Sequence, residues 1–135
     1  MRIKKLSLSL ILVFSLSLLL ISNTFAAPRW NYAASVDPSL AFNGSTAECF
    51  ANISGKDGVT KIVATVELQV KNSSGSYVRS ASWSTRTVYG TDLSFSEFAY
   101  NRPAGEYRLI VNATFYNASG ASEKVYAESY ATCRG

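Results

Sequence analysis

Apolar and polar side chains alternate along residues 61–71. Apart from Val63, every second residue is polar or charged, and the residues between them are Ile62, Ala64, Val66, Leu68 and Val70. A period of two indicates a β-strand with one buried face. Turn-forming residues occupy 72–75, and the alternation then resumes over 77–84, so we predict a β-hairpin. In its second strand, Tyr77 and Trp83 are expected on the core face.

The same alternation recurs in other segments, at 45–53, 105–116 and 122–133. Residues 91–100 form a shorter strand of ambiguous facing, in which Glu97 shares a face with two apolar residues. Residues 32–42 contain Pro38, which cannot donate a ladder hydrogen bond and therefore indicates an edge strand or a strand break. Glycine, asparagine and serine mark the turns between these segments. The pattern predicts an all-β fold, an antiparallel sandwich of about seven strands.

The first 26 residues follow a different rule. Arg2, Lys4 and Lys5 precede an apolar run over 6–21, and the segment ends at Ala26 with small residues at the first and third places of its last triplet. This arrangement is typical of a signal peptide, and we predict cleavage after Ala26. A retained membrane anchor is the alternative, but the serine-interrupted run is shorter than the roughly 20 residues that span a bilayer. We therefore expect a secreted chain over 27–135, a single domain without a membrane anchor.

Two cysteines are present, Cys49 and Cys133. An exported chain meets oxidising conditions, so we predict a disulfide between them. Closing so long a loop would stabilise the fold by about 4 kcal/mol if no strain opposes it. Two free thiols, or a link between two copies, are the alternatives.

Charge and residue types exclude several functions. Removal of the leader leaves ten basic residues against nine acidic ones, and the basic residues are scattered, so we predict no nucleic-acid binding. The chain has no histidine, which excludes histidine-based triads and most zinc sites. A hydrolase would have to use carboxylates such as Asp92 and Glu97, and Asp57 is a lone carboxylate in a turn, a poor start for a calcium site. We predict no enzyme activity, no cofactor and no metal.

Three tyrosines share the parity opposite to the expected core face: Tyr116, Tyr126 and Tyr130. If the last two strands pair, these rings lie on one outer surface, where flat aromatic side chains can stack on sugars or anchor a protein. The alternative is that tyrosine simply suits a half-buried pleat.

The segment 102–117, RPAGEYRLIVNATFYN, resembles the penultimate strand of immunoglobulin-like and fibronectin type III-like domains. The resemblance implies a tyrosine corner, in which the hydroxyl of Tyr107 bonds back to the preceding connection. The chain departs from antibody domains, because its second cysteine is on the last strand and Trp83 follows Cys49 by many positions. The mature pattern is also similar to small exported proteins of Gram-positive bacteria with no assigned activity.

These observations favour a secreted, non-enzymatic domain that acts by surface recognition at or outside the bacterial envelope. The expected partner is cell-wall glycan or an extracellular protein. The alternative is a secreted inhibitor or antibacterial effector that acts on a partner protein or a membrane.

Overall fold

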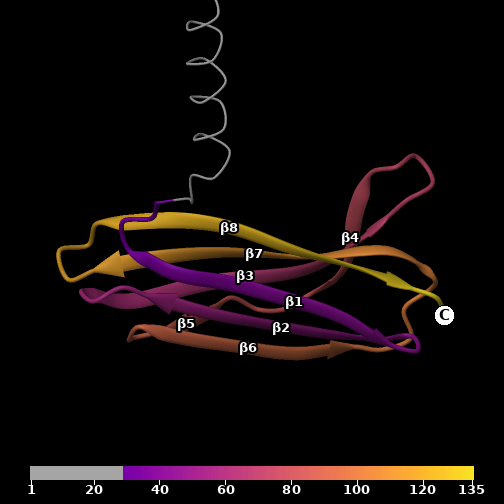
Figure 1. Ribbon diagram of the computed structural model, residues 1–135, viewed down its shortest axis with the longest axis horizontal. Helices are drawn as coiled ribbons and strands as arrows, with labels where there is room; N and C mark the ends of the chain where they lie inside the picture. The colour runs from indigo at the N-terminus through magenta and orange to yellow at the C-terminus, as the bar shows by residue number, and fades with distance from the viewer. Residues whose placement is uncertain (1–28) are drawn as a thin grey trace, which may run out of the picture.

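The computed structural model describes residues 29–135, so the signal peptide predicted over 1–26 lies outside the described residues. Figure 1 shows two layers of strands. The described residues contain no helix long and apolar enough to cross a membrane. The eight strands are β1 (Ala33–Asn43), β2 (Thr46–Gly55), β3 (Val59–Lys71), β4 (Tyr77–Ser82), β5 (Arg86–Val88), β6 (Asp92–Ala99), β7 (Gly105–Asn117) and β8 (Ser122–Cys133).

The strands form two antiparallel sheets, which we call sheet A and sheet B. Sheet A has the order β1-β2-β6, and sheet B has the order β4-β3-β7-β8, with β5 pairing the other half of β3. Strands β1, β2 and β6 thus lie opposite the other five. The antiparallel β-sandwich predicted from the alternation is confirmed.

The core lies between the inner faces of the two sheets. It is built from the residues that the alternation places on one face of each strand, including all of the predicted set on β3 except Val70, which is partly buried. Tyr107 and Phe115 from β7 are among the largest fully buried side chains. No polar or charged side chain is buried among the described residues, so the core needs no internal polar network.

The tyrosine corner is confirmed. The hydroxyl of Tyr107 donates a hydrogen bond to the carbonyl oxygen of Pro103, at 2.6 Å. This bond satisfies the hydroxyl, which is the only polar atom of the buried Tyr107 side chain. It also fixes the connection from β6 to β7.

Strand β4 differs from the prediction. The register between β3 and β4 shifts at Leu68 and Gln69, where a bulge at Ser80 adds one residue to β4. An added residue reverses the facing of what precedes it. Tyr77 therefore lies on the outer face of sheet B, contrary to the prediction, whereas Trp83 packs against Phe95 of the core, with ring centroids 5.3 Å apart. The alternation also missed β5, which has only three residues.

The predicted disulfide is wrong: Cys49 and Cys133 are both buried free thiols. The sulfur of Cys133 lies beside the β1–β2 turn, 3.6 Å from the carbonyl oxygen of Gly44. The pair Asn43 and Thr46 closes that turn, and Cys49 lies three residues farther along β2. Three residues of strand correspond to about 10 Å, whereas a disulfide needs Cα atoms within about 7 Å. Both cysteine side chains face the core, but they lie at different positions along the direction of the strands.

Each side of the sandwich is closed by a contact between the sheets. On one side β1 lies along β8, and the carboxylate of Glu123 accepts three backbone N–H bonds from Asn31, Tyr32 and Ala33, at 2.7, 2.9 and 3.0 Å. On the other side β5 meets β6, and Arg86 pairs with Glu97 at 3.1 Å.

Candidate functional site

The outer face of sheet B carries a cluster of tyrosine, arginine and carboxylate side chains. Pairing across the sheet sets one row of residues, because Gln69 lies opposite Arg79 on one side and Arg108 on the other, and Arg108 lies opposite Tyr130. Four adjacent strands thus each contribute one side chain to a single line. We call the tyrosine–arginine cluster the set Gln69, Tyr77, Arg108, Tyr126, Glu128 and Tyr130.

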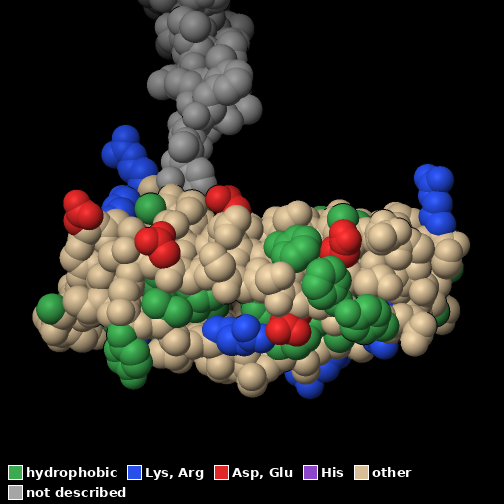
Figure 2. Space-filling model, turned by 90° about the horizontal axis from the view of Figure 1, so that it is seen from below, with side chains coloured by type: hydrophobic (Ala, Val, Ile, Leu, Met, Phe, Trp, Pro, Cys, Tyr) green, Lys and Arg blue, Asp and Glu red, His purple; other side chains and the backbone are tan. Residues whose placement is uncertain are grey.

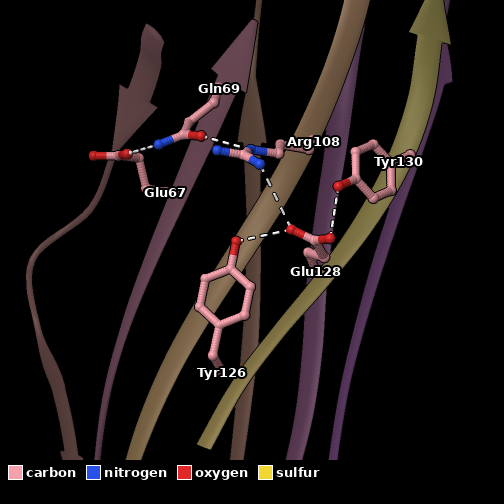
Figure 3. Close-up of polar contacts among 6 residues, drawn as sticks. All are labelled: Glu67, Gln69, Arg108, Tyr126, Glu128 and Tyr130. Atoms are coloured by element: carbon pink, nitrogen blue, oxygen red, sulfur yellow. Dashed lines mark hydrogen bonds and ion pairs between the residues drawn. The ribbon is translucent and has the colours of Figure 1, made fainter. Parts of the chain in front are cut away.

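Glu128 is at the centre of this cluster, as Figure 3 shows. The hydroxyl of Tyr126 donates to one carboxylate oxygen of Glu128, at 2.8 Å, and the hydroxyl of Tyr130 donates to the other, at 2.6 Å. The residues are two apart on β8, so all three side chains leave the same face of the strand. The carboxylate therefore fixes both rings.

The same hydrogen bonds shift the acidity of these groups. The bond from Tyr130, followed by the bond from Tyr126, lowers the pKa of the Glu128 carboxyl, so the carboxylate is ionised at neutral pH. In turn the bond to Glu128 is the main cause that raises the pKa of Tyr130, which keeps its hydroxyl protonated and able to donate.

Arg108 joins the tyrosines to the rest of the sheet. Its Nε donates to Oε1 of Gln69 at 2.7 Å, and its Nη1 lies 3.7 Å from Oε2 of Glu128. Its guanidinium also lies 4.2 Å from the centre of the Tyr77 ring, a distance typical of a cation–π contact. Tyr77 and Tyr130 then meet edge to face, with centroids 6.2 Å apart.

Polar contacts continue from the cluster to β4. Gln69 donates through Nε2 to Glu67 at 2.5 Å, and Arg79 donates through Nε to the other oxygen of Glu67 at 2.6 Å. Each of the two arginines therefore faces a carboxylate, and the network is close to electrically neutral.

Shallow grooves flank the network at both ends. One, of about 360 Å³, is lined by Lys71, Tyr77, Glu106, Tyr107, Tyr130, Ala131 and Thr132. The other, of about 350 Å³, is lined by residues that include Glu67, Arg79 and Trp83. A chain-like ligand could thus lie along the surface with polar groups and aromatic rings beneath it.

The three tyrosines singled out in the sequence do not form one plate. Tyr126 and Tyr130 are 51% and 54% exposed and are joined through Glu128. Tyr116 shares their face, but its partner on β8 is Ser122, four residues before Tyr126. Tyr116 therefore lies farther towards the end of the sheet. There its ring contacts Lys61, whose Nζ is 4.3 Å from the ring centre.

The candidate catalytic carboxylates are not brought together. Asp92 accepts a hydrogen bond from the hydroxyl of Ser54 at 2.9 Å on the outer face of sheet A, whereas Glu97 pairs with Arg86 at the edge between the sheets. The two residues are five positions apart on β6, about 16 Å along a strand. Asp57 has no companions either, because no group of three metal-binding side chains exists within residues 29–135.

The sequence reasoning missed Gln69, Tyr77, Arg108 and Glu128 as members of the cluster. Glu128 and Arg108 have the same parity on their strands as the tyrosines, so the alternation carried a signal for them. Gln69 is identified only by the β3–β7 register, and Tyr77 only by the β4 bulge.

Comparisons with known proteins identify no family for this chain. No protein-family model matches the sequence, and no curated protein matches it. Among solved structures, the chain is similar to Spo0M, a sporulation control protein from Bacillus subtilis, at 14% identity and a TM-score of 0.34. The match covers 77% of this chain and 49% of that one, so this chain spans about half the length of that structure.

Proposed function

We propose that this protein is a secreted, non-enzymatic β-sandwich that binds glycan at or outside the bacterial envelope, through the tyrosine–arginine cluster on sheet B. The observation that carries the proposal is the pair Tyr126 and Tyr130. Each ring is half exposed, and each hydroxyl is held by Glu128.

The ring geometry suits a saccharide. The apolar faces of sugar rings stack on flat aromatic side chains, and a ring already fixed by its hydroxyl loses little conformational freedom when a ligand binds. Tyrosine also keeps two lone pairs on its oxygen, so a sugar hydroxyl can donate to it while the tyrosine proton stays on Glu128.

The polar groups beside the rings suit the same ligand. Sugars present many hydroxyls, which need both donors and acceptors, and the cluster offers the guanidinium of Arg108 in contact with the amide of Gln69 and the carboxylate of Glu128. The arginines are paired with carboxylates, so the surface presents no excess of charge that would favour an anionic polymer over a neutral one.

The test is binding of the purified protein to insoluble bacterial cell wall and to soluble neutral polysaccharides, by pull-down and by affinity electrophoresis. Tyr130→Ala should reduce the affinity by about tenfold or more, equivalent to about 1.4 kcal/mol. Arg108→Met should reduce it by a similar factor, because it removes the donor that links the rings to Gln69.

The matched control is Tyr89→Ala. Tyr89 lies between β5 and β6, outside the cluster, and is 84% exposed, so its loss should leave glycan binding unchanged. Equal losses in Tyr89→Ala and Tyr130→Ala, or no retention on any glycan, would refute the proposal. Inhibition of bacterial growth by the purified protein, without glycan binding, would support the effector hypothesis instead.

A further inference from the structure

The outer face of sheet A carries a second aromatic surface, on the opposite side of the molecule from the tyrosine–arginine cluster. Phe50 on β2 packs edge to face on Phe98 of β6, with ring centroids 6.0 Å apart. Phe98 in turn stacks on Tyr100, at 6.3 Å and an interplanar angle of 27°. Phe98 is 44% exposed and Tyr100 is 62% exposed. We call Glu48, Phe50, Phe98 and Tyr100 the aromatic–acidic surface.

The charged side chains on the strands of sheet A all have one sign. The strands of sheet A contain Asp37, Glu48, Asp92 and Glu97, and they contain no lysine or arginine. The strands of sheet B, by contrast, contain six basic residues, Lys61, Lys71, Arg79, Arg86, Arg108 and Lys124. Figure 2, which views the molecule from the side of β6, shows hydrophobic side chains close together on the right of that side with acidic side chains beside them, and a basic side chain next to an acidic one in the middle.

Glu48 lies at the centre of the aromatic–acidic surface. Its register partner on β6 is Phe98, so the carboxylate and the exposed ring are neighbours across the strand pair. Within residues 29–135, no hydrogen bond or ion pair engages the carboxylate of Glu48, whereas that of Glu97 is paired with Arg86. The basic residue nearest to Tyr100 in the sequence, Arg102, donates to the carbonyl oxygens of Tyr100 and Ser80.

These features fit a cation with an apolar stem. A guanidinium or ammonium group is attracted to the face of an aromatic ring and to a carboxylate, and the methylenes behind it cover the neighbouring rings. A purely apolar ligand would desolvate Glu48 without compensation, and an anionic ligand would be repelled by the acids of sheet A.

We propose that the aromatic–acidic surface docks an arginine- or lysine-bearing segment of another extracellular protein. The surface lies on the outer face of sheet A and the glycan cluster lies on the outer face of sheet B, so both can be occupied at once. The protein would then link a basic protein segment on one side to a glycan bound by the tyrosine–arginine cluster on the other. This docking does not depend on the glycan proposal, because it uses different residues.

The probe is a short oligo-arginine peptide, and the measurement is fluorescence anisotropy of the labelled peptide at about 0.15 M salt, where charges beyond about 8 Å are screened. Glu48→Gln and Phe98→Ala should each weaken binding by about fivefold or more, since each removes about 1 kcal/mol of pairing or cation–π attraction. Tyr100→Ala, at a more exposed position, tests the same surface with less risk to folding.

The matched control is Glu106→Gln, which neutralises an exposed carboxylate on sheet B and leaves the aromatic–acidic surface intact. Its effect should stay below twofold. An equal loss in Glu106→Gln and Glu48→Gln, or no binding of the peptide, would overturn the proposal. Concentration-dependent dimers in sedimentation equilibrium that disappear in Tyr100→Ala would also overturn it, because a second copy would then cover the surface.

Discussion

The two sheets bury the same kind of residue but present different surfaces. Sheet B is crossed by ion pairs, at Lys71–Glu106, Arg79–Glu67 and Arg108–Glu128, whereas sheet A has no ion pair between its own strands within the described residues. Sheet A is covered instead by small polar residues, three aromatic rings and unpaired acids. The buried side chains of both are apolar.

The difference shows that the core and the surfaces are specified separately. Residues of one parity build a single core, and residues of the other parity decide what each outer face can recognise. Because the core is shared, damage to either inner face should destabilise the whole molecule. Because the outer faces are distinct, changes to one should leave binding at the other intact.

The largest expected effect concerns Cys49, on the inner face of sheet A. Burial, followed by the charge of Glu97, raises the pKa of this thiol from 9.0 to about 12. At pH 8 the thiolate fraction is then lower by about a thousandfold than for an exposed cysteine, and thiolate is the reactive form. In a Cys133→Ser variant, alkylation by iodoacetamide should therefore be very slow in the folded protein and fast in denaturant.

Cys133→Ser suits this measurement because serine can keep the contacts to the carbonyl oxygens of Gly44 and Arg102, at 3.6 and 3.7 Å from the native sulfur. Rapid alkylation of Cys49 in the folded variant would show that sheet A opens without global unfolding.

The next effect compares equal deletions in the two inner faces. Ile53 on β2 and Leu109 on β7 are both fully buried. Ile53→Ala and Leu109→Ala should each lower the free energy of unfolding by about 2–5 kcal/mol, through lost burial and the cavity left behind. Urea unfolding followed by tryptophan fluorescence and by circular dichroism measures the loss. Transitions that no longer coincide in one variant would mean that the sheets unfold separately.

How much of this the sequence could predict follows from the same division. The period of two identifies the strands and their inner faces, because hydrophobic burial depends on facing alone. Tyr107 was also predictable, since a proline–glycine turn before a strand-opening tyrosine is a local pattern. The predicted facing was wrong where it depends on more than the local pattern. At Tyr77, the bulge at Ser80 places the side chain on the opposite face of the sheet.

Positions along the strands were not predictable in the same way. Alternation correctly places Cys49 and Cys133 in the core, but it does not fix their positions along the direction of the strands, which depend on turn positions and strand pairing. The same limit applies to the tyrosine–arginine cluster. Tyr126 and Tyr130 could be assigned to an outer face from parity, whereas their link to Arg108 and Gln69 required the register of three strands.

A smaller effect tests the side of the sandwich where β1 meets β8. Burial alone would raise the pKa of Glu123, but the backbone bonds from Asn31, Tyr32 and Ala33 outweigh it, and the pKa in the folded state is lowered. A lowered folded pKa stabilises the protein above the unfolded pKa of about 4.3, and the contribution is lost as pH falls through the folded value.

Glu123→Gln should therefore cost about 1 kcal/mol at neutral pH, through the loss of charge-assisted hydrogen bonds. The difference from the parent protein should shrink as the pH falls through the lowered pKa of Glu123 in the folded state, because the carboxyl itself then becomes neutral. Urea unfolding at a series of pH values measures it. A constant difference down to acid pH would mean that geometry, and not the charge, is what matters in this contact.

The smallest effect is expected where β5 meets β6, on the opposite side. Arg86 and Glu97 pair at 3.1 Å, but both side chains are partly exposed, so water and salt weaken their attraction. Such pairs contribute about 0.2–1 kcal/mol. In a double-mutant cycle with Arg86→Met and Glu97→Gln, the coupling should fall in that range and decrease in high salt. Arg86 also lies 5.0 Å from the centre of the Phe95 ring, so Arg86→Met should cost more than Glu97→Gln. A coupling much larger than that range would show that charge holds β5 against β6, as it links the strands on the outer face of sheet B. The contrast between an apolar interior and a polar exterior would then not hold where β5 meets β6.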